Sequence, residues 1–212
     1  MEGKKGMIMF VHGGEVFADR GEVPAYLREK RQFRDPFWNP DGRTSWRENI
    51  ARRYFGRADI LMPEMPNKID ARYAEWEAWF DRHVPLFRDG VILVGSSLGG
   101  IFLAKYLAVH PLPVRVGLLA LVSAPFDDEA DGPLGDFRLP DDLEDLARQT
   151  DRIILFHSSD DPVVPVAELG KYARALSGAE AVVLDGRGHF FAEEFPELSD
   201  RIGQALDLYG SV

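Results

Sequence analysis

Residues 91–110 read VILVGSSLGGIFLAKYLAVH, and this stretch decides the predicted fold. The short run at 91–94 is apolar and uncharged, as in a strand that is buried on both faces of a sheet. The largely apolar segment that follows GSSLGG is typical of a helix. A strand that passes into a helix within a few residues is the basic joint of an α/β domain.

Similar apolar runs recur along the chain, at 7–11, 59–62, 116–122, 153–156 and 181–184. Segments of helical period lie between them, with apolar stripes at Tyr73, Trp76, Phe80 and Val84, at Leu169, Tyr172, Ala173 and Leu176, and at Ile202, Leu206 and Tyr209. This alternation predicts one α/β domain over residues 1–212 with a mainly parallel sheet. In such sheets the chemistry gathers in loops that leave the carboxyl ends of the strands.

Gly95, Ser97 and Gly99 have the G-x-S-x-G spacing, which places a serine at a sharp turn from strand to helix. Side chains on either side of such a turn would clash, so glycine is needed at both positions. The pattern is weak by itself because glycine and serine are common residues. The strand predicted before it and the helix predicted after it make Ser97 the candidate nucleophile. Ser96 occupies the variable position and is assigned no chemistry.

A serine nucleophile needs a base, and the base needs an acid that orients it. Where this motif is catalytic, the acid and then the base follow the serine along the chain, each after a strand. The run at 153–156 leads into HSSDDPVVP, which offers Asp161, with Asp160 as the alternative. Asp161 is preferred because it directly precedes Pro162 at the start of the next loop. Helix capping or turn formation would also account for either aspartate.

The run at 181–184 leads into DGRGHF, which makes His189 the candidate base. His189 is the only histidine after His157, and a histidine side chain can take up a proton near neutral pH. His83 and His110 fall in segments of helical period and are assigned no chemistry.

Two backbone amides are predicted to hold the negative oxygen that forms when a serine attacks a carbonyl group. The first belongs to Leu98, at the start of the predicted helix. The second belongs to the loop after the first strand, where the sequence is HGGE. Gly14 is preferred there, and Glu15 is the neighbouring alternative. His12 is expected to hold this loop by hydrogen bonding rather than to act as a base.

The composition argues against several classes of partner. With 25 basic and 35 acidic residues, the chain has a formal charge of −10, which is unfavourable for binding nucleic acid. There are no cysteines, so disulfides, thiolate metal sites and a cysteine nucleophile are excluded. A metal site built from His157, Asp160, Asp161 and His189 is the weaker alternative, because the sequence has no HxH or HExxH spacing. We expect neither a metal nor another cofactor.

No apolar run approaches the roughly 18 residues needed to cross a bilayer. The apolar run at the start of the chain also ends too early for a secretory signal. We therefore expect a cytoplasmic protein that is not inserted into a membrane.

The segments HGG, GSSLGG, SSDDPVVP and GRGHF occur in this order and cover the chain from about residue 7 to residue 208. The chain thereby resembles the α/β-hydrolase superfamily. It resembles more narrowly the small cap-less serine hydrolases related to retinoblastoma-binding protein nine, in MPEMPNKID, VGSSLGG, ALVSAPFDDE, HSSDDPVVP and GHFFAEEFPEL. The resemblance implies six parallel strands in the order 2-1-3-4-5-6, with helices on both faces. It also implies Ser97 as nucleophile, Asp161 as acid and His189 as base.

The passage at 17–57 departs from that family, which crosses this region in fewer residues. It is rich in arginine, proline and aromatic residues, among them Phe33, Phe37, Trp38 and Trp46. We expect it to form either a lid over the serine or a surface elaboration that packs on the edge of the sheet, with neither favoured.

Together these patterns predict a serine hydrolase that cleaves a small ester, with a thioester or an activated amide as the alternative substrate. The alternatives are a hydrolase-like binding module with little turnover and an acyltransferase that uses an acceptor other than water. The sequence indicates neither the physiological substrate nor the oligomeric state.

Overall fold

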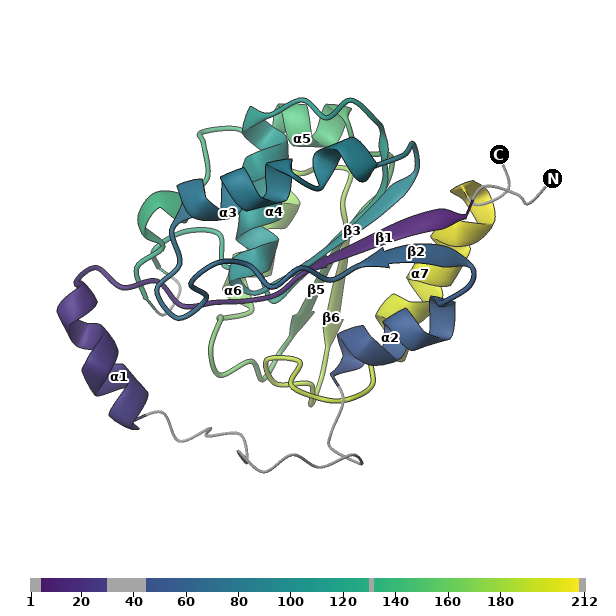
Figure 1. Cartoon of the computed structure of the whole chain (residues 1–212). Helices are drawn as coiled ribbons and strands as arrows, with labels where there is room; N and C mark the ends of the chain where they lie inside the picture. Colours follow the sequence, from purple (N-terminus) through teal and green to yellow (C-terminus); the bar gives the residue numbers. More distant parts are fainter. Residues whose placement is uncertain (1–4, 30–44, 130–131, 210–212) are drawn as a thin grey trace.

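Six parallel strands form one sheet in the computed structural model, which describes residues 5–29, 45–129 and 132–209 (Figure 1). The strands are β1 (Gly6–Val11), β2 (Ala58–Leu61), β3 (Val91–Ser96), β4 (Val116–Val122), β5 (Ile153–Ser158) and β6 (Glu180–Leu184). They lie in the order β2-β1-β3-β4-β5-β6, and every neighbouring pair is parallel. The predicted fold class and strand order are confirmed, and the carboxyl ends of all six strands lie at the same edge of the sheet.

Alternate residues of each strand face opposite sides of the sheet, and helices cover both sides. Met7, Met9 and Val11 of β1 belong to one buried cluster, whereas Ile8 and Phe10 belong to the other. The first cluster is closed by α3 (Tyr73–Asp81), α4 (Leu98–Val109), α5 (Glu144–Arg148) and α6 (Ala167–Ala175). The second is closed by α2 (Trp46–Tyr54) and α7 (Pro196–Tyr209) on the opposite side of the sheet (Figure 1).

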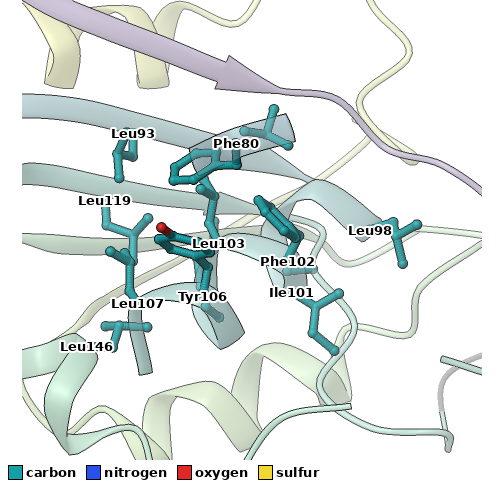
Figure 2. Packing of buried hydrophobic residues seen from close by; sticks show 14 of the residues in the cluster. Phe80, Leu93, Leu98, Ile101, Phe102, Leu103, Tyr106, Leu107, Leu119 and Leu146 are labelled. Carbon is teal, nitrogen blue, oxygen red and sulfur yellow. The ribbon is translucent and has the colours of Figure 1, made fainter. Parts of the chain in front are cut away.

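Helix α4 is apolar around most of its circumference because it lies buried between the sheet and other helices. Figure 2 shows its side chains packed among residues of the sheet, α3 and α5; those labelled are Leu98, Ile101, Phe102, Leu103, Tyr106 and Leu107. This packing holds the first turn of α4 in place, directly after Ser97.

The predicted burial on both faces holds for the four inner strands and is wrong for the two edge strands. β1, β3, β4 and β5 are almost wholly buried. β6 alternates between half-buried and exposed residues, and β2 has one buried, one exposed and two half-buried residues. An edge strand pairs on one side only, so its residues are covered less completely.

The predicted apolar stripes mostly lie on helices. Tyr73, Trp76 and Phe80 are buried on α3, but Val84 lies beyond the end of that helix, in a short 3-10 helix at Val84–Leu86. Residues buried as predicted on the later helices are Leu169 and Tyr172 of α6 and Ile202 and Leu206 of α7. The stripes therefore locate the helices correctly but run past the ends of α3 and α6, since Leu176 directly follows the last residue of α6.

The passage at 17–57 is described only near its two ends, and Phe33, Phe37 and Trp38 lie outside the described residues. After β1 come a short 3-10 helix (Arg20–Glu22) and α1 (Val23–Glu29), which stands apart from the sheet in Figure 1. The predicted lid stays a prediction, because three of the four aromatic residues on which it rests are not described.

The end of the same passage packs on the sheet. Helix α2 begins at a capping box, in which Ser45 and Glu48 each accept a hydrogen bond from the other's backbone amide. Trp46 is 3% exposed, and its ring meets the rings of Phe10 and Phe195 edge-on. Trp46 therefore belongs to the core rather than to a cover over the serine.

Candidate active site

Ser97 lies in a strained turn between β3 and α4. Its backbone has φ 54° and ψ −126°, in a region that residues other than glycine rarely adopt. A Cβ atom on Gly95 would lie closer than 3.0 Å to the Gly99 carbonyl oxygen, and one on Gly99 would lie equally close to the Val11 carbonyl oxygen. The predicted clash is present on both sides, so both glycines are required by the close approach of the backbone.

Asp161 and His189 meet at the carboxyl edge of the sheet. Asp161 follows β5 and His189 follows β6, and neither side chain is more than 8% exposed. His189 Nδ1 lies 2.9 Å from Asp161 Oδ2 and 3.0 Å from Oδ1. Because an ionised carboxylate can only accept, Nδ1 donates the hydrogen bond and Nε2 is left as the nitrogen that can take up a proton.

Asp161 is held by three further donors. The backbone amides of Val163 and Val164 donate to Oδ1 at 2.9 and 3.0 Å, and Ser123 Oγ donates to Oδ2 at 2.6 Å. Burial alone raises the pKa of Asp161, but the hydrogen bonds from His189, Ser123 and the two amides outweigh burial and lower that pKa to about 2. The carboxylate is therefore ionised at neutral pH and can stabilise a positively charged imidazole.

Asp160, the alternative acid, faces elsewhere. Its Oδ1 accepts hydrogen bonds from Ser158 Oγ at 2.5 Å and from the Gly188 amide at 3.1 Å. Asp160 therefore holds the backbone just before His189, whereas Asp161 holds the ring.

The two amides predicted to bind a negative oxygen are available. Within the described part of the chain, neither the Leu98 amide nor the Gly14 amide donates a hydrogen bond. The Glu15 amide, the alternative to Gly14, donates to the Lys68 carbonyl at 2.8 Å and is therefore occupied. A Cβ atom on Gly13 would lie 3.0 Å from Ser97 Cβ, so this loop runs directly beside the serine.

His12 supports that loop, as predicted. Its Nδ1 donates to the Gly13 carbonyl at 2.6 Å, and its Nε2 accepts from the Met65 amide at 2.8 Å. Burial lowers the pKa of His12, which favours the neutral ring that these two bonds require. Because both ring nitrogens are engaged, His12 is unsuited to act as a base.

A family model described as serine hydrolase matches residues 36–199, which is more than half of the chain. The chain belongs to this family. The serine hydrolase RBBP9 of Rattus norvegicus is 30% identical over 138 residues, which make up 65% of this chain and 73% of the relative.

Solved structures share the fold of this serine hydrolase. The ydeN gene product of B. subtilis has a TM-score of 0.74 at 17% identity, and the match covers 96% of this chain and 100% of that one. An esterase from Exiguobacterium antarcticum has a TM-score of 0.62 at 14% identity, with 97% and 93% covered. At these identities the likeness establishes the α/β-hydrolase fold alone.

Sequence reasoning missed Ser123, which touches Asp161. Ser123 directly follows β4, is 1% exposed and has a left-handed backbone with φ 45°. Its position after the strand that neighbours β5 was the available signal, because adjacent parallel strands bring their following residues together.

Sequence reasoning also missed the contacts that α2 makes with both candidate loops. Trp46 Nε1 donates to the Phe190 carbonyl at 3.0 Å, directly after His189. Arg47 Nη1 donates to Ser96 Oγ at 2.9 Å, directly before Ser97. No motif marks these contacts, since they join residues 144 and 49 positions apart.

The hydrogen bond expected between the candidate nucleophile and the candidate base is not formed among the described residues. Among the hydrogen bonds of the described residues, none joins Ser97 Oγ to His189 Nε2. Such bonds are often long before substrate binds. In the same part of the chain, no group of three or more histidine or acidic side chains is arranged to hold a metal ion. Nor does any described helix have the length and apolar character needed to span a membrane.

Proposed function

We propose that this serine hydrolase cleaves a small carboxylic ester through Ser97, His189 and Asp161. His189 Nε2 takes the proton from Ser97 as Oγ attacks the carbonyl carbon of the ester. The bond to the alcohol then breaks, and His189 gives its proton to the departing oxygen. Water that loses a proton to His189 attacks the acyl carbon; as the bond from that carbon to Ser97 Oγ breaks, His189 gives this proton to Oγ, which releases the acid and restores Ser97.

The surrounding groups stabilise the charges that form along this path. The Leu98 and Gly14 amides hold the negative oxygen of the tetrahedral intermediate, and the start of α4 adds its favourable dipole. Asp161 keeps the proton of His189 on Nδ1 and stabilises the charged ring. No dissociable cofactor takes part.

The buried hydrogen bond between His189 and Asp161 carries the proposal. It lies at the sheet edge where Ser97 occupies its strained turn, and the orientation of the carboxylate is secured by three other donors. A binding module has no need of a strained serine beside amides that, among the described residues, donate no hydrogen bond.

Labelling with a fluorophosphonate tests the nucleophile, and hydrolysis of p-nitrophenyl esters of graded acyl length tests turnover. We expect labelling and hydrolysis in the wild type and neither in Ser97→Ala. Labelling that survives Ser97→Ala would contradict the mechanism. A ligand-induced shift in melting temperature without turnover of any ester would favour a binding module instead.

Product analysis in the presence of added alcohols or amines separates hydrolysis from acyl transfer. We expect the free acid as the main product, since water is the proposed acceptor. The cytoplasmic location stays a prediction from the sequence.

A further inference from the structure

The loop after His189 sends two adjacent phenylalanines in opposite directions. Phe190 has a left-handed backbone with φ 53°, which turns the chain sharply. Its side chain is 6% exposed and packs on Phe195, with ring centroids 4.6 Å apart. Phe191 is 66% exposed, and its ring centroid lies 5.3 Å from that of His189. The core therefore uses the first aromatic ring and leaves the second beside the candidate base.

The exposure of Phe191 is unusual among the described phenylalanines. Of the phenylalanines that the structure describes, only Phe55 and Phe191 are exposed. Phe55, at 84% exposed, caps the end of α2 and precedes β2, so it lies toward the amino edge of the sheet. Val163, in the loop that carries Asp161, is also 40% exposed. Apolar surface is thus left open in the two loops that carry Asp161 and His189.

In the proposed reaction, the positions of His189 and the two amides determine which part of an ester lies near Phe191. His189 Nδ1 is occupied by Asp161, so Nε2 must protonate the departing alcohol oxygen. The carbonyl oxygen lies at the Leu98 and Gly14 amides. The alcohol portion must therefore lie on the His189 side, within reach of a ring that touches His189.

We infer that Phe191 binds the alcohol portion of the substrate, and that the substrates are esters of apolar alcohols with an alkyl chain or an aromatic ring. This inference rests on the proposed function. Covering the exposed ring removes apolar surface from water, and an aromatic partner gains a ring contact as well.

A series of acetates tests this inference, because the acyl group stays the same while the alcohol changes. We expect kcat/KM of the wild type to rise from ethyl through butyl to hexyl and benzyl acetate. In Phe191→Ala the benzyl-to-ethyl ratio should fall roughly three- to tenfold, the range for one aromatic contact. Phe191→Leu should retain most of the preference for hexyl acetate.

Phe55→Ala is the matched control, because it removes an even more exposed ring at the other end of the sheet. Its alcohol preference should equal that of the wild type. The dependence on acyl length, measured with p-nitrophenyl esters, should be the same in Phe191→Ala as in the wild type.

A flat alcohol series, or a benzyl-to-ethyl ratio unchanged by Phe191→Ala, would overturn the inference and leave the proposed function standing. Fluorophosphonate labelling of Ser97 without hydrolysis of any acetate would overturn it as well. Absence of both labelling and turnover would instead remove the proposed function on which it rests.

Discussion

The turn at Ser97 joins β3 to α4 within one residue, whereas the loop at His189 runs from the end of β6 at Leu184 to the start of α7 at Pro196. Backbone atoms of neighbouring strands and of α4 press on both sides of the serine turn, so only glycines fit beside it. The histidine loop is held by hydrogen bonds from distant parts of the chain. The position of the serine is therefore set by close backbone packing, part of it against β1, and that of the histidine by hydrogen bonds from distant segments.

The largest expected effect is on kcat, and it distinguishes the two adjacent aspartates that follow β5. Asp161→Asn should lower kcat roughly 10⁴-fold, because the amide no longer keeps the His189 proton on Nδ1. Asp160→Asn keeps an acceptor oxygen for the Gly188 amide and should lower kcat less than about tenfold. Steady-state kinetics on one p-nitrophenyl ester checks both, and equal losses would contradict the different roles of the two carboxylates.

The glycines of the two regions should respond differently to alanine. Gly99→Ala should lower the free energy of unfolding by more than about 3 kcal/mol, because its Cβ meets backbone that cannot move aside. A Cβ atom added at Gly188 would meet no atom within 4 Å. Gly188→Ala should therefore lower the free energy of unfolding by only about 1 kcal/mol, which is the cost of a left-handed backbone with φ 51°. Urea unfolding measures both, and a larger loss in Gly188→Ala would reverse the comparison.

Protonation of Asp161 in acid should destabilise the folded protein, because the carboxylate then no longer accepts the hydrogen bond from His189. The pKa of this carboxyl group is lowered to about 2 in the folded protein, so the stability it contributes is fully present above about pH 4 and is lost as the pH falls toward 2. The lowered pKa corresponds to about 2 kcal/mol. Between pH 4 and pH 2 the free energy of unfolding should fall more steeply in the wild type than in Asp161→Asn, as measured by urea unfolding at each pH. Parallel curves would show that Asp161 does not carry this dependence.

The smallest expected effect concerns the support from α2. Trp46→Phe keeps an aromatic ring but removes the donor to the Phe190 carbonyl, and should cost about 1 kcal/mol of stability. It should also lower kcat roughly tenfold with KM unchanged, since His189 is held less firmly. Rapid-mixing or steady-state assays measure kcat, and calorimetry measures stability.

Trp79→Phe is the control, because the Trp79 Nε1 atom has no hydrogen-bond partner among the described residues. Both its stability and its kcat should stay near those of the wild type. A loss of kcat in Trp79→Phe as large as in Trp46→Phe would show that the effect is not specific to the histidine loop.

Much of the candidate site could be predicted because parallel strands place their following loops at one edge. The order of Ser97, Asp161 and His189 along the chain, each after a strand, was enough to propose their roles. The burial of the edge strands was predicted wrongly, because the apolar run of β6 does not reveal that it pairs on one side only.

The contacts that refine the site were beyond sequence reasoning for a different reason. Ser123 stands in no motif, and Trp46 contributes an indole N–H to a carbonyl 144 positions away. A single sequence records residue types and spacings, whereas such contacts depend on how the strand order folds distant segments together.

By itself the sequence determined the strand-to-helix turn at Ser97, because the glycine spacing and the close approach of Gly95 to Gly99 involve residues a few positions apart. The approach of Gly99 to Val11 comes instead from the pairing of β1 with β3. The sequence also determined the class of fold through its alternating periods. Only the tertiary structure decided that Asp161 rather than Asp160 faces His189 and that Phe191 lies open beside the base. It also decided that the Glu15 amide is occupied, whereas the Gly14 amide donates no hydrogen bond among the described residues. Those outcomes depend on directions of side chains and amides, which are set by packing between segments far apart in the chain.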